Sequence, residues 1–284
     1  MSLLPTPLVS ADELAEQLNH DNLVLLDASW YLPAMKRDGF LEWQEQRISN
    51  AQHFDFHGEV CDQESEYPHT MPSPELFTQS AQTLGINQDS HIVVYDGMGL
   101  FASPRVWWMF KAMGHDNVSV LNGGLPKWIE SGFPLNISKP VSPNTGNFIA
   151  RPAMNKFIDA ESVLTKLDDE SIAVIDARGT NRFDGTEAEP REGVRSGRIP
   201  NSKNLPFTNL ITDGLLQSTS DLEQQLSIVA SKDQQLIFSC GSGVTACHLA
   251  LAAELCGYNK LSVFDGSWSE WGARHELPIE TGKA

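Results

Sequence analysis

The sequence predicts an α/β protein built from two tandem domains, each a mostly parallel sheet with helices on both faces. Three observations lead to this prediction. The 284-residue chain repeats four blocks of sequence at a nearly constant offset. Within each copy, short apolar runs alternate with segments of helical composition, which is typical of parallel strands joined by helices. A stretch rich in Pro, Ser, Asn and Gly, residues 136–155, separates the copies. We expect domains at 1–137 and 155–284, with a linker at 138–154.

The two copies begin in the same way. In the first, Ser10 and Glu13 form a capping box that predicts a short helix, and the apolar run 22–30 predicts a strand. In the second, residues 159–162 open a helix, and 171–179 predict the matching strand.

Each block of the repeat has its counterpart in the same order along the chain. The paired segments are Asp27-Ala28 with Asp176-Ala177, 47–56 with 198–207, 91–102 with 235–246, and 119–128 with 262–271. Four blocks in one order indicate a duplicated domain.

Composition excludes several classes of partner. The formal net charge is −17, which disfavours nucleic acid and anionic membrane surfaces. No apolar run approaches the roughly 18 residues of a membrane span. The first ten residues lack a positively charged start and a long apolar run, so no signal peptide is indicated. The four cysteines form no CxxC pair, which favours reduced thiols. We therefore expect a cytoplasmic protein without nucleic-acid or membrane partners.

The stretch 236–256 carries the candidate chemistry. Residues 236–238 have the character of a buried strand, and 244–255 have helical composition. Cys240 lies between them, in a loop where Gly241 and Gly243 permit backbone angles that a Cβ would forbid. Backbone N–H groups and a helix N-terminus favour an anion there, and they would lower the pKa of a cysteine.

The repeat compares this loop with its own twin. Aligning the copies puts Asp96 opposite Cys240, while Gly97 and Gly99 preserve the loop frame. A carboxylate is an odd replacement for a merely packed thiol. We interpret the second copy as chemically active and the first as structural.

Three reactions could use a cysteine among amides. A phosphatase loop needs an arginine six residues after the cysteine, where this chain has Ala246. A cysteine hydrolase needs a His base, but His248 lies on the helix, facing away from the loop mouth. Sulfur transfer remains, because a ring of backbone N–H groups can stabilise a persulfide anion.

The loop CGSGVTA, the two-copy layout, and the segments SPRVWWMF and DGSWSEW resemble the tandem rhodanese-type sulfurtransferases over essentially the whole chain. The resemblance implies two rhodanese-like domains and no metal or organic cofactor. Within that superfamily, CGSGVT is similar to the 3-mercaptopyruvate sulfurtransferases, whereas thiosulfate sulfurtransferases typically carry the basic loop CRKGVT. An uncharged Gly241-Ser242 pair places the recognition of the substrate's charge elsewhere.

A cluster of arginines can supply that recognition. Arg182 and Arg191 match the carboxylate-binding arginines of the family by resemblance, and a guanidinium binds a carboxylate through two hydrogen bonds. Arg182 could instead form a surface ion pair with Glu187 or Glu189. The remaining arginines of the cluster are interpreted as structural; they are Arg178, Arg195 and Arg198.

A histidine is also implied by the resemblance. His69, in a Pro-rich loop of the first copy, matches a family histidine that approaches the loop serine, here Ser242. The family's acidic partner position holds His57, which leaves two alternatives: Asp55 or Asp62 substitutes, or the relay lacks an acidic member. His69 could equally line a domain interface.

The resulting hypothesis is a sulfurtransferase that moves the sulfur of 3-mercaptopyruvate through a Cys240 persulfide to a thiol, a thioredoxin-like protein or cyanide, releasing pyruvate. The alternatives are a thiosulfate:cyanide sulfurtransferase and a non-enzymatic persulfide carrier. The predicted substrate contacts include loop residues beside the cysteine, namely Gly241, Gly243, Val244 and Thr245. Residues expected only to pack are Trp107, Trp108, Cys247 and Cys256.

Overall fold

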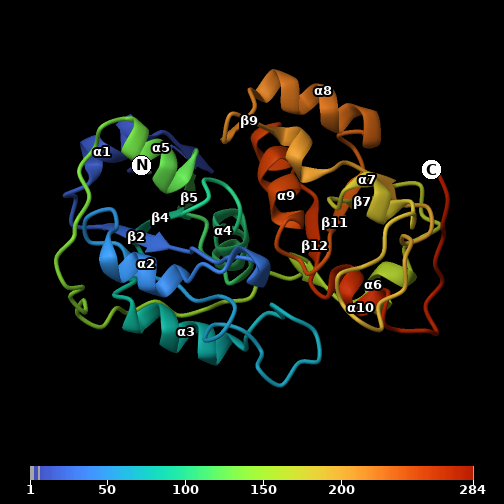
Figure 1. Ribbon diagram of the computed structural model, residues 1–284, viewed down its shortest axis with the longest axis horizontal. Coiled ribbons are helices and arrows are strands. Elements are labelled where there is room, and N and C mark those ends of the chain that lie inside the picture. Colours follow the sequence, from blue (N-terminus) through green and yellow to red (C-terminus); the bar gives the residue numbers. More distant parts are fainter. Residues whose placement is uncertain (1–2, 6, 284) are drawn as a thin grey trace. The chain divides into compact units, whose positions relative to one another are not determined.

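Each half of the chain folds around its own five-stranded sheet, as the computed structural model shows (Figure 1). The structure describes residues 3–5 and 7–283. Its contacts divide the chain into two units. The first comprises the residues up to Gln63, Met71–Ala153 and Asp213–Leu216, and the second comprises Glu64–Thr70, Met154–Thr212 and the residues from Gln217 onward.

The sheet of the first unit has the strand order β1-β5-β4-β2-β3, and every neighbouring pair is parallel. The elements of its main chain segment are β1 (Leu8–Val9), α1 (Ala11–Gln17), β2 (Leu23–Asp27), the 3₁₀ turn η1 (Pro33–Met35), α2 (Gly39–Glu45), β3 (Gln52–His53), α3 (Pro74–Thr83), β4 (His91–Tyr95), α4 (Ser103–Ala112), β5 (Val118–Leu121) and α5 (Gly124–Glu130). The short strand β10 (Leu215–Leu216) also belongs to this unit.

Local sequence signals explain where these elements begin. The capping box at α1 is present: Glu13 N donates to Ser10 Oγ at 3.3 Å, and Ser10 N donates to Glu13 Oε2 at 2.9 Å. Ser73 caps α3, and Pro74 takes its first position, where a missing N–H costs nothing. The predicted strand 22–30 is found as the five residues of β2.

Both faces of the first sheet are covered by helices. On one face, Leu14 of α1 and Trp128 of α5 pack with Val93 of β4 in a buried cluster. Helices α3 and α4 contribute an aromatic cluster in which Phe77 and Phe110 lie 4.9 Å apart. The predicted two-sided arrangement is confirmed for this unit.

The second sheet repeats the first, with order β6-β12-β11-β7-β8 and all pairs parallel. The elements after the linker are β6 (Phe157–Ile158), α6 (Ala160–Leu164), β7 (Ile172–Asp176), α7 (Thr180–Phe183), β8 (Lys203–Asn204), η2 (Phe207–Leu210), β9 (Ile211–Thr212), α8 (Thr219–Val229), β11 (Gln235–Ser239), α9 (Ala246–Leu255), β12 (Leu261–Phe264) and α10 (Ser267–Trp271). Asp159 caps α6, as predicted. Helices α6 and α10 pack on one face of the sheet, and α9 contacts β11 and β12.

Strand register brings equivalent carboxylates to the same edge of each sheet. Asp27, the last residue of β2, pairs with Tyr95, the last of β4. Asp176, the last of β7, pairs with Ser239, the last of β11. The next residue after each of these partners opens the loop that the repeat singled out. Such loops at the carboxyl ends of parallel strands are where α/β folds place their sites.

The two equivalent aspartates are satisfied differently. Asp176 is buried against Arg178, whose Nη2 lies 2.7 Å from its Oδ2. In the first unit Ser29 replaces the arginine, and its amide donates to Asp27 Oδ1 at 2.9 Å. Burial without a cation raises the pKa of Asp27 to about 6 from 3.8, although the hydrogen bonds from Ser29 oppose the shift.

This shift predicts a pH dependence of stability. The folded state binds the Asp27 proton more tightly than the unfolded chain does. The carboxyl group therefore destabilises the folded state least below its unfolded pKa of 3.8 and most above its folded pKa of about 6. The free energy of unfolding of the wild type should therefore fall by about 3 kcal/mol between these two pH values, and Asp27→Asn should abolish this fall. Urea unfolding of both proteins across that interval measures the difference, with exposed Asp89→Asn as the control. Equal pH slopes for wild type and Asp27→Asn would contradict the assignment.

Candidate active site

Cys240 is fixed at the start of the turn that follows β11. The residue is 1% exposed, and its amide donates to Ser267 Oγ at 3.2 Å. Its carbonyl accepts from the Trp268 amide at 3.0 Å. Ser267 itself has a positive φ of 49°, so α10 begins in a left-handed residue that turns its hydroxyl toward the loop. The backbone of Cys240 is thus held from the start of the next helix.

The turn reaches α9 through a glycine and a tight 3₁₀-type bend. Gly243 has φ +75°, which a side chain would strain. The amides of Cys247 and His248 donate three residues back, to Val244 and Thr245. The regular helix therefore begins at Ala246, two residues later than the composition predicts.

Four loop amides remain available for a ligand. Among the residues that the structure describes, the N–H groups of Gly241, Ser242, Val244 and Thr245 donate no hydrogen bond. Amides in such a turn at a helix N-terminus form a concave site for an anion. Three of the predicted contact residues, Gly241, Val244 and Thr245, therefore carry unused donors beside the thiol.

The twin loop in the first unit shows what such amides bind. The Asp96 carboxylate accepts from the amides of Met98, Phe101, Ala102 and Ser103, each at 2.9 Å, and from Ser103 Oγ at 2.8 Å. In the repeat, Met98 and Phe101 correspond to Ser242 and Thr245. A negative group attached at the cysteine position therefore satisfies this loop frame.

Ser242 lies beside His69, as the family resemblance implies. Ser242 Oγ and His69 Nδ1 are 3.1 Å apart, within hydrogen-bond distance. His69 is buried and has a positive φ of 64°, an uncommon conformation for histidine. Its segment, Glu64–Thr70, belongs to the second unit although it is encoded within the first repeat.

The alternative acidic partners lie in the first unit. The Asp55 carboxylate accepts from the amides of His57 at 3.0 Å and Gly58 at 2.8 Å, so it stabilises its own turn. Cys61 Sγ donates to His57 O at 3.0 Å. An acidic partner for His69 stays a prediction.

The arginines of the second unit form a chain of ion pairs. Arg178 binds both Asp176 and Glu189, with its Nη1 at 2.7 Å from Glu189 Oε1. Arg182 binds the same glutamate through Nε, at 3.2 Å, and through Nη2. The Arg182 guanidinium also lies over the loop, because a Cβ on Gly241 would meet its Nη2 at 3.3 Å. Arg182 thus makes the ion pair that sequence offered as an alternative, and it also reaches the site.

Arg191 is linked to the same loop through Ser269. Its Nη1 donates to Ser269 Oγ at 2.5 Å, and the amide of Ser269 donates to Gly241 O at 2.8 Å. Desolvation lowers the pKa of Arg191, Cys240 opposes this effect, and Arg182 adds to it. Arg182, Arg191 and Cys240 are therefore brought together.

Two site residues, Ser267 and Ser269, were missed from sequence, and Glu189 was named only as a possible partner of Arg182. Ser267 Oγ accepts from the Cys240 amide, and Ser269 Oγ donates to the Gly241 carbonyl. Glu189 joins two arginines. The repeat offered a signal for Ser269, because its twin is Pro126, which has no N–H. Glu189 carried only a generic signal as a nearby carboxylate.

Other singled-out residues have structural surroundings. His248 is buried with its ring 4.9 Å from Phe207. Arg195 donates to carbonyls of Trp271, Gly272, Arg274 and Leu277, and Arg198 to Gly282 O. The remaining residues expected to pack are buried; they are Trp107, Trp108, Cys247 and Cys256.

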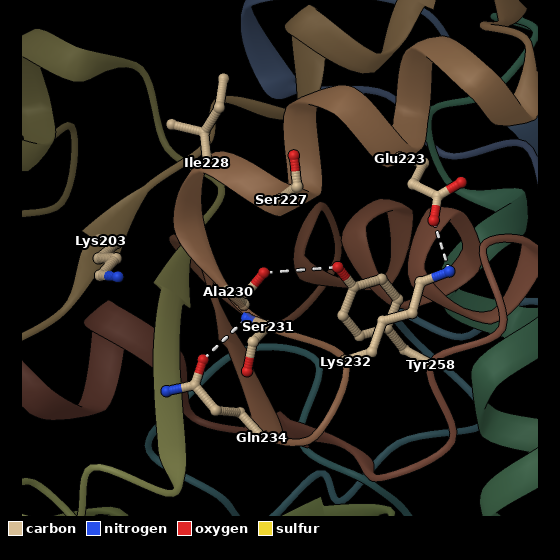
Figure 2. A pocket seen from close by; sticks show the side chains of 9 residues that line it. All are labelled: Lys203, Glu223, Ser227, Ile228, Ala230, Ser231, Lys232, Gln234 and Tyr258. Atoms are coloured by element: carbon tan, nitrogen blue, oxygen red, sulfur yellow. Dashed lines mark hydrogen bonds and ion pairs between the residues drawn. The ribbon is translucent and has the colours of Figure 1, made fainter.

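Within residues 3–5 and 7–283, no group of three His, Cys, Asp or Glu side chains is placed to hold a metal ion. No helix in these ranges is both long and apolar enough to cross a bilayer. A separate hollow of ≈ 390 Å³ lies between α8, the following loop and Tyr258 (Figure 2). Its Lys232 is paired with Glu223 at 2.5 Å, and it contains none of the predicted site residues.

The fold and the cysteine loop define a member of the rhodanese family, and the rhodanese-like domain matches residues 10–131 and 159–274. The chain belongs to this family and is a sulfurtransferase that acts on small sulfur donors. It is 42% identical to human 3-mercaptopyruvate sulfurtransferase, covering 97% of this chain and 96% of the relative. It is also 42% identical to the thiosulfate sulfurtransferase of Cricetulus griseus, covering 96% and 94%. The crystal structure of SseA from Escherichia coli, described as a 3-mercaptopyruvate sulfotransferase, has a TM-score of 0.85 at 34% identity, covering 93% and 99%.

The Asp96 contacts predict that the first loop requires an anion. Asp96→Ala leaves four N–H groups and one hydroxyl without their acceptor, and should destabilise the first unit by about 3–5 kcal/mol. Urea unfolding followed by tryptophan fluorescence measures the loss. Asp89→Ala, an exposed aspartate of the same unit, is the matched control. A loss no larger than the control's would show that the loop does not depend on the carboxylate.

Proposed function

We propose that this sulfurtransferase takes the sulfur of 3-mercaptopyruvate onto Cys240 as a persulfide, releases pyruvate, and passes the outer sulfur to an acceptor. The acceptor is a small thiol, a reduced thioredoxin-like protein or cyanide. The proposed setting is the cytoplasm, where thiols are kept reduced.

The single observation that carries this proposal is the Asp96 carboxylate in the twin loop. Its oxygens stand two bonds from Cβ, and the outer sulfur of a cysteine persulfide also stands two bonds from Cβ. Four amides converge on the carboxylate in the first unit, whereas the equivalent loop beside Cys240 keeps unused donors. A persulfide anion on Cys240 would take the place that the carboxylate takes in the twin.

The choice of donor rests on charge. A thiosulfate dianion favours basic residues beside the attacked sulfur, but Gly241 and Ser242 are uncharged. The carboxylate of 3-mercaptopyruvate lies at the far end from its sulfur, and Arg182 and Arg191 both approach the loop and can bind it.

The first half-reaction balances without a cofactor. The Cys240 thiolate attacks the thiol sulfur, an S–S bond forms, and the C–S bond breaks with its electron pair left on the pyruvate enolate. The thiol proton moves to the enolate carbon, giving pyruvate and the persulfide anion. Ser242 and His69, 3.1 Å apart, offer a path for this proton. The two arginines hold the carboxylate so that the sulfur faces Cys240.

The second half-reaction regenerates the Cys240 thiolate. An acceptor thiolate attacks the outer sulfur, a new S–S bond forms on the acceptor, and the electron pair of the broken bond restores the Cys240 thiolate. The loop amides stabilise negative charge in both states of the cysteine.

Replacing the nucleophile tests the reaction. Cys240→Ser should abolish pyruvate formation from 3-mercaptopyruvate with dithiothreitol, and the protein should no longer gain the mass of one sulfur atom without acceptor. Cys61→Ser, a cysteine of the first unit, is the control. Retained turnover in Cys240→Ser would end the proposal. Wild-type preference for thiosulfate plus cyanide would favour the thiosulfate alternative, and turnover of neither donor would favour a carrier.

Removing one carboxylate-binding arginine should weaken substrate binding. Arg182→Ala or Arg191→Ala should raise KM for 3-mercaptopyruvate by the loss of a charged hydrogen bond, about 1.5–3 kcal/mol, or roughly 10- to 150-fold. Steady-state kinetics measure the change, with Arg151→Ala, an exposed arginine, as the control. Unchanged KM in both site variants would show that the carboxylate is held elsewhere.

A further inference from the structure

Glu189 occupies an unusual place between two guanidinium groups. Its Oε1 accepts from Arg178 Nη1 at 2.7 Å and from Arg182 Nε at 3.2 Å, and its Oε2 accepts from Arg182 Nη2. The glutamate side chain is only 4% exposed. At such low exposure, solvent screens its charge weakly, so the carboxylate acts strongly on both arginines.

The site therefore has a defined balance of charge. Arg178 is already paired with Asp176 through two oxygens, so Glu189 chiefly offsets Arg182. Arg191 donates to the neutral Ser269 and makes no ion pair with a described residue. Apart from the Cys240 thiolate, three guanidinium groups against two carboxylates leave one net positive charge around the substrate end of the site.

The position of Arg182 makes this balance relevant to the donor. Its Nη2 lies 3.3 Å from the place of a Cβ on Gly241, directly beside the cysteine. A guanidinium there, without Glu189, would put a second uncompensated positive charge close to the attacked sulfur. Such a charge would favour a compact dianion, whose negative charge lies next to its sulfur.

We propose that Glu189 is a specificity-determining residue: by offsetting Arg182 it leaves one positive charge at the site, which selects monoanionic sulfur donors over dianionic ones. This inference rests on the proposed function and adds to it the residue that sets the preferred charge of the donor. Glu189 acts through the arginines and does not itself take part in the sulfur transfer.

Glu189→Gln tests the charge with little change of shape: the amide oxygen can still accept from Arg178 and Arg182 in the place of Oε1, while the acceptor in the place of Oε2 is lost. The ratio of kcat/KM for thiosulfate to kcat/KM for 3-mercaptopyruvate should rise about tenfold or more, since one unit charge within a few ångströms of the anion is no longer offset. The rise should shrink at high salt. An unchanged ratio, or an equal loss with both donors, would overturn the inference.

Two further variants separate charge from structure. Glu187→Gln makes the same substitution two residues away, on an exposed side chain, and should leave the ratio at its wild-type value. The double variant Arg182→Gln/Glu189→Gln restores one net positive charge and should return the ratio toward wild type, although both donors bind less well. A ratio that stays high in the double variant would show that charge is not the cause.

An equilibrium measurement keeps the inference testable if Glu189→Gln fails to fold. Calorimetric titration of the Cys240→Ser protein with pyruvate and with sulfate compares a monoanion with a dianion. Pyruvate should bind about tenfold more tightly, and equal or tighter sulfate binding would overturn the inference. This binding measurement does not depend on turnover. A wild-type protein that turns over neither donor would contradict the proposed function, whereas the relative affinities for pyruvate and sulfate would still test the charge preference.

Discussion

The site depends on a small set of backbone N–H groups that converge on one point and require a negative charge there. The first unit meets this requirement permanently through the Asp96 carboxylate. The second unit has Cys240 at the equivalent position, and among the described residues the amides of Gly241, Ser242, Val244 and Thr245 donate no hydrogen bond. One backbone frame thus forms a closed structural turn in one copy and keeps unused donors beside a cysteine in the other.

A second difference between the copies lies at the end of the neighbouring strand. Asp27 is buried beside a serine, whereas Asp176 is buried beside Arg178, which extends through Glu189 to Arg182. An added arginine therefore does more than balance a buried carboxylate. It begins a connected series of charges that ends beside the Cys240 loop, so the position of Arg182 is coupled to the packing of the sheet edge.

The fold and the nucleophile loop could be predicted because both are encoded locally. The repeat located equivalent strands, caps marked helix starts at Ser10 and Asp159, and the Gly-bracketed cysteine followed an apolar run. Glu189, Ser267 and Ser269 could not be assigned in this way, because their roles arise from contacts between segments far apart in the chain. The start of α9 was misplaced by two residues because composition does not distinguish a 3₁₀-type bend from the first helical turn.

The segment Glu64–Thr70 has a consequence for the independence of the two copies. It is encoded within the first repeat, yet it belongs to the second unit and brings His69 to Ser242. The sheet of the second unit is complete without it, so a chain starting at the linker could fold and still lack this histidine. A chain without the first repeat would therefore lose the 3.1 Å contact between His69 and Ser242. The first repeat thus supplies a segment to the unit that carries Cys240, although it has no cysteine at the equivalent position.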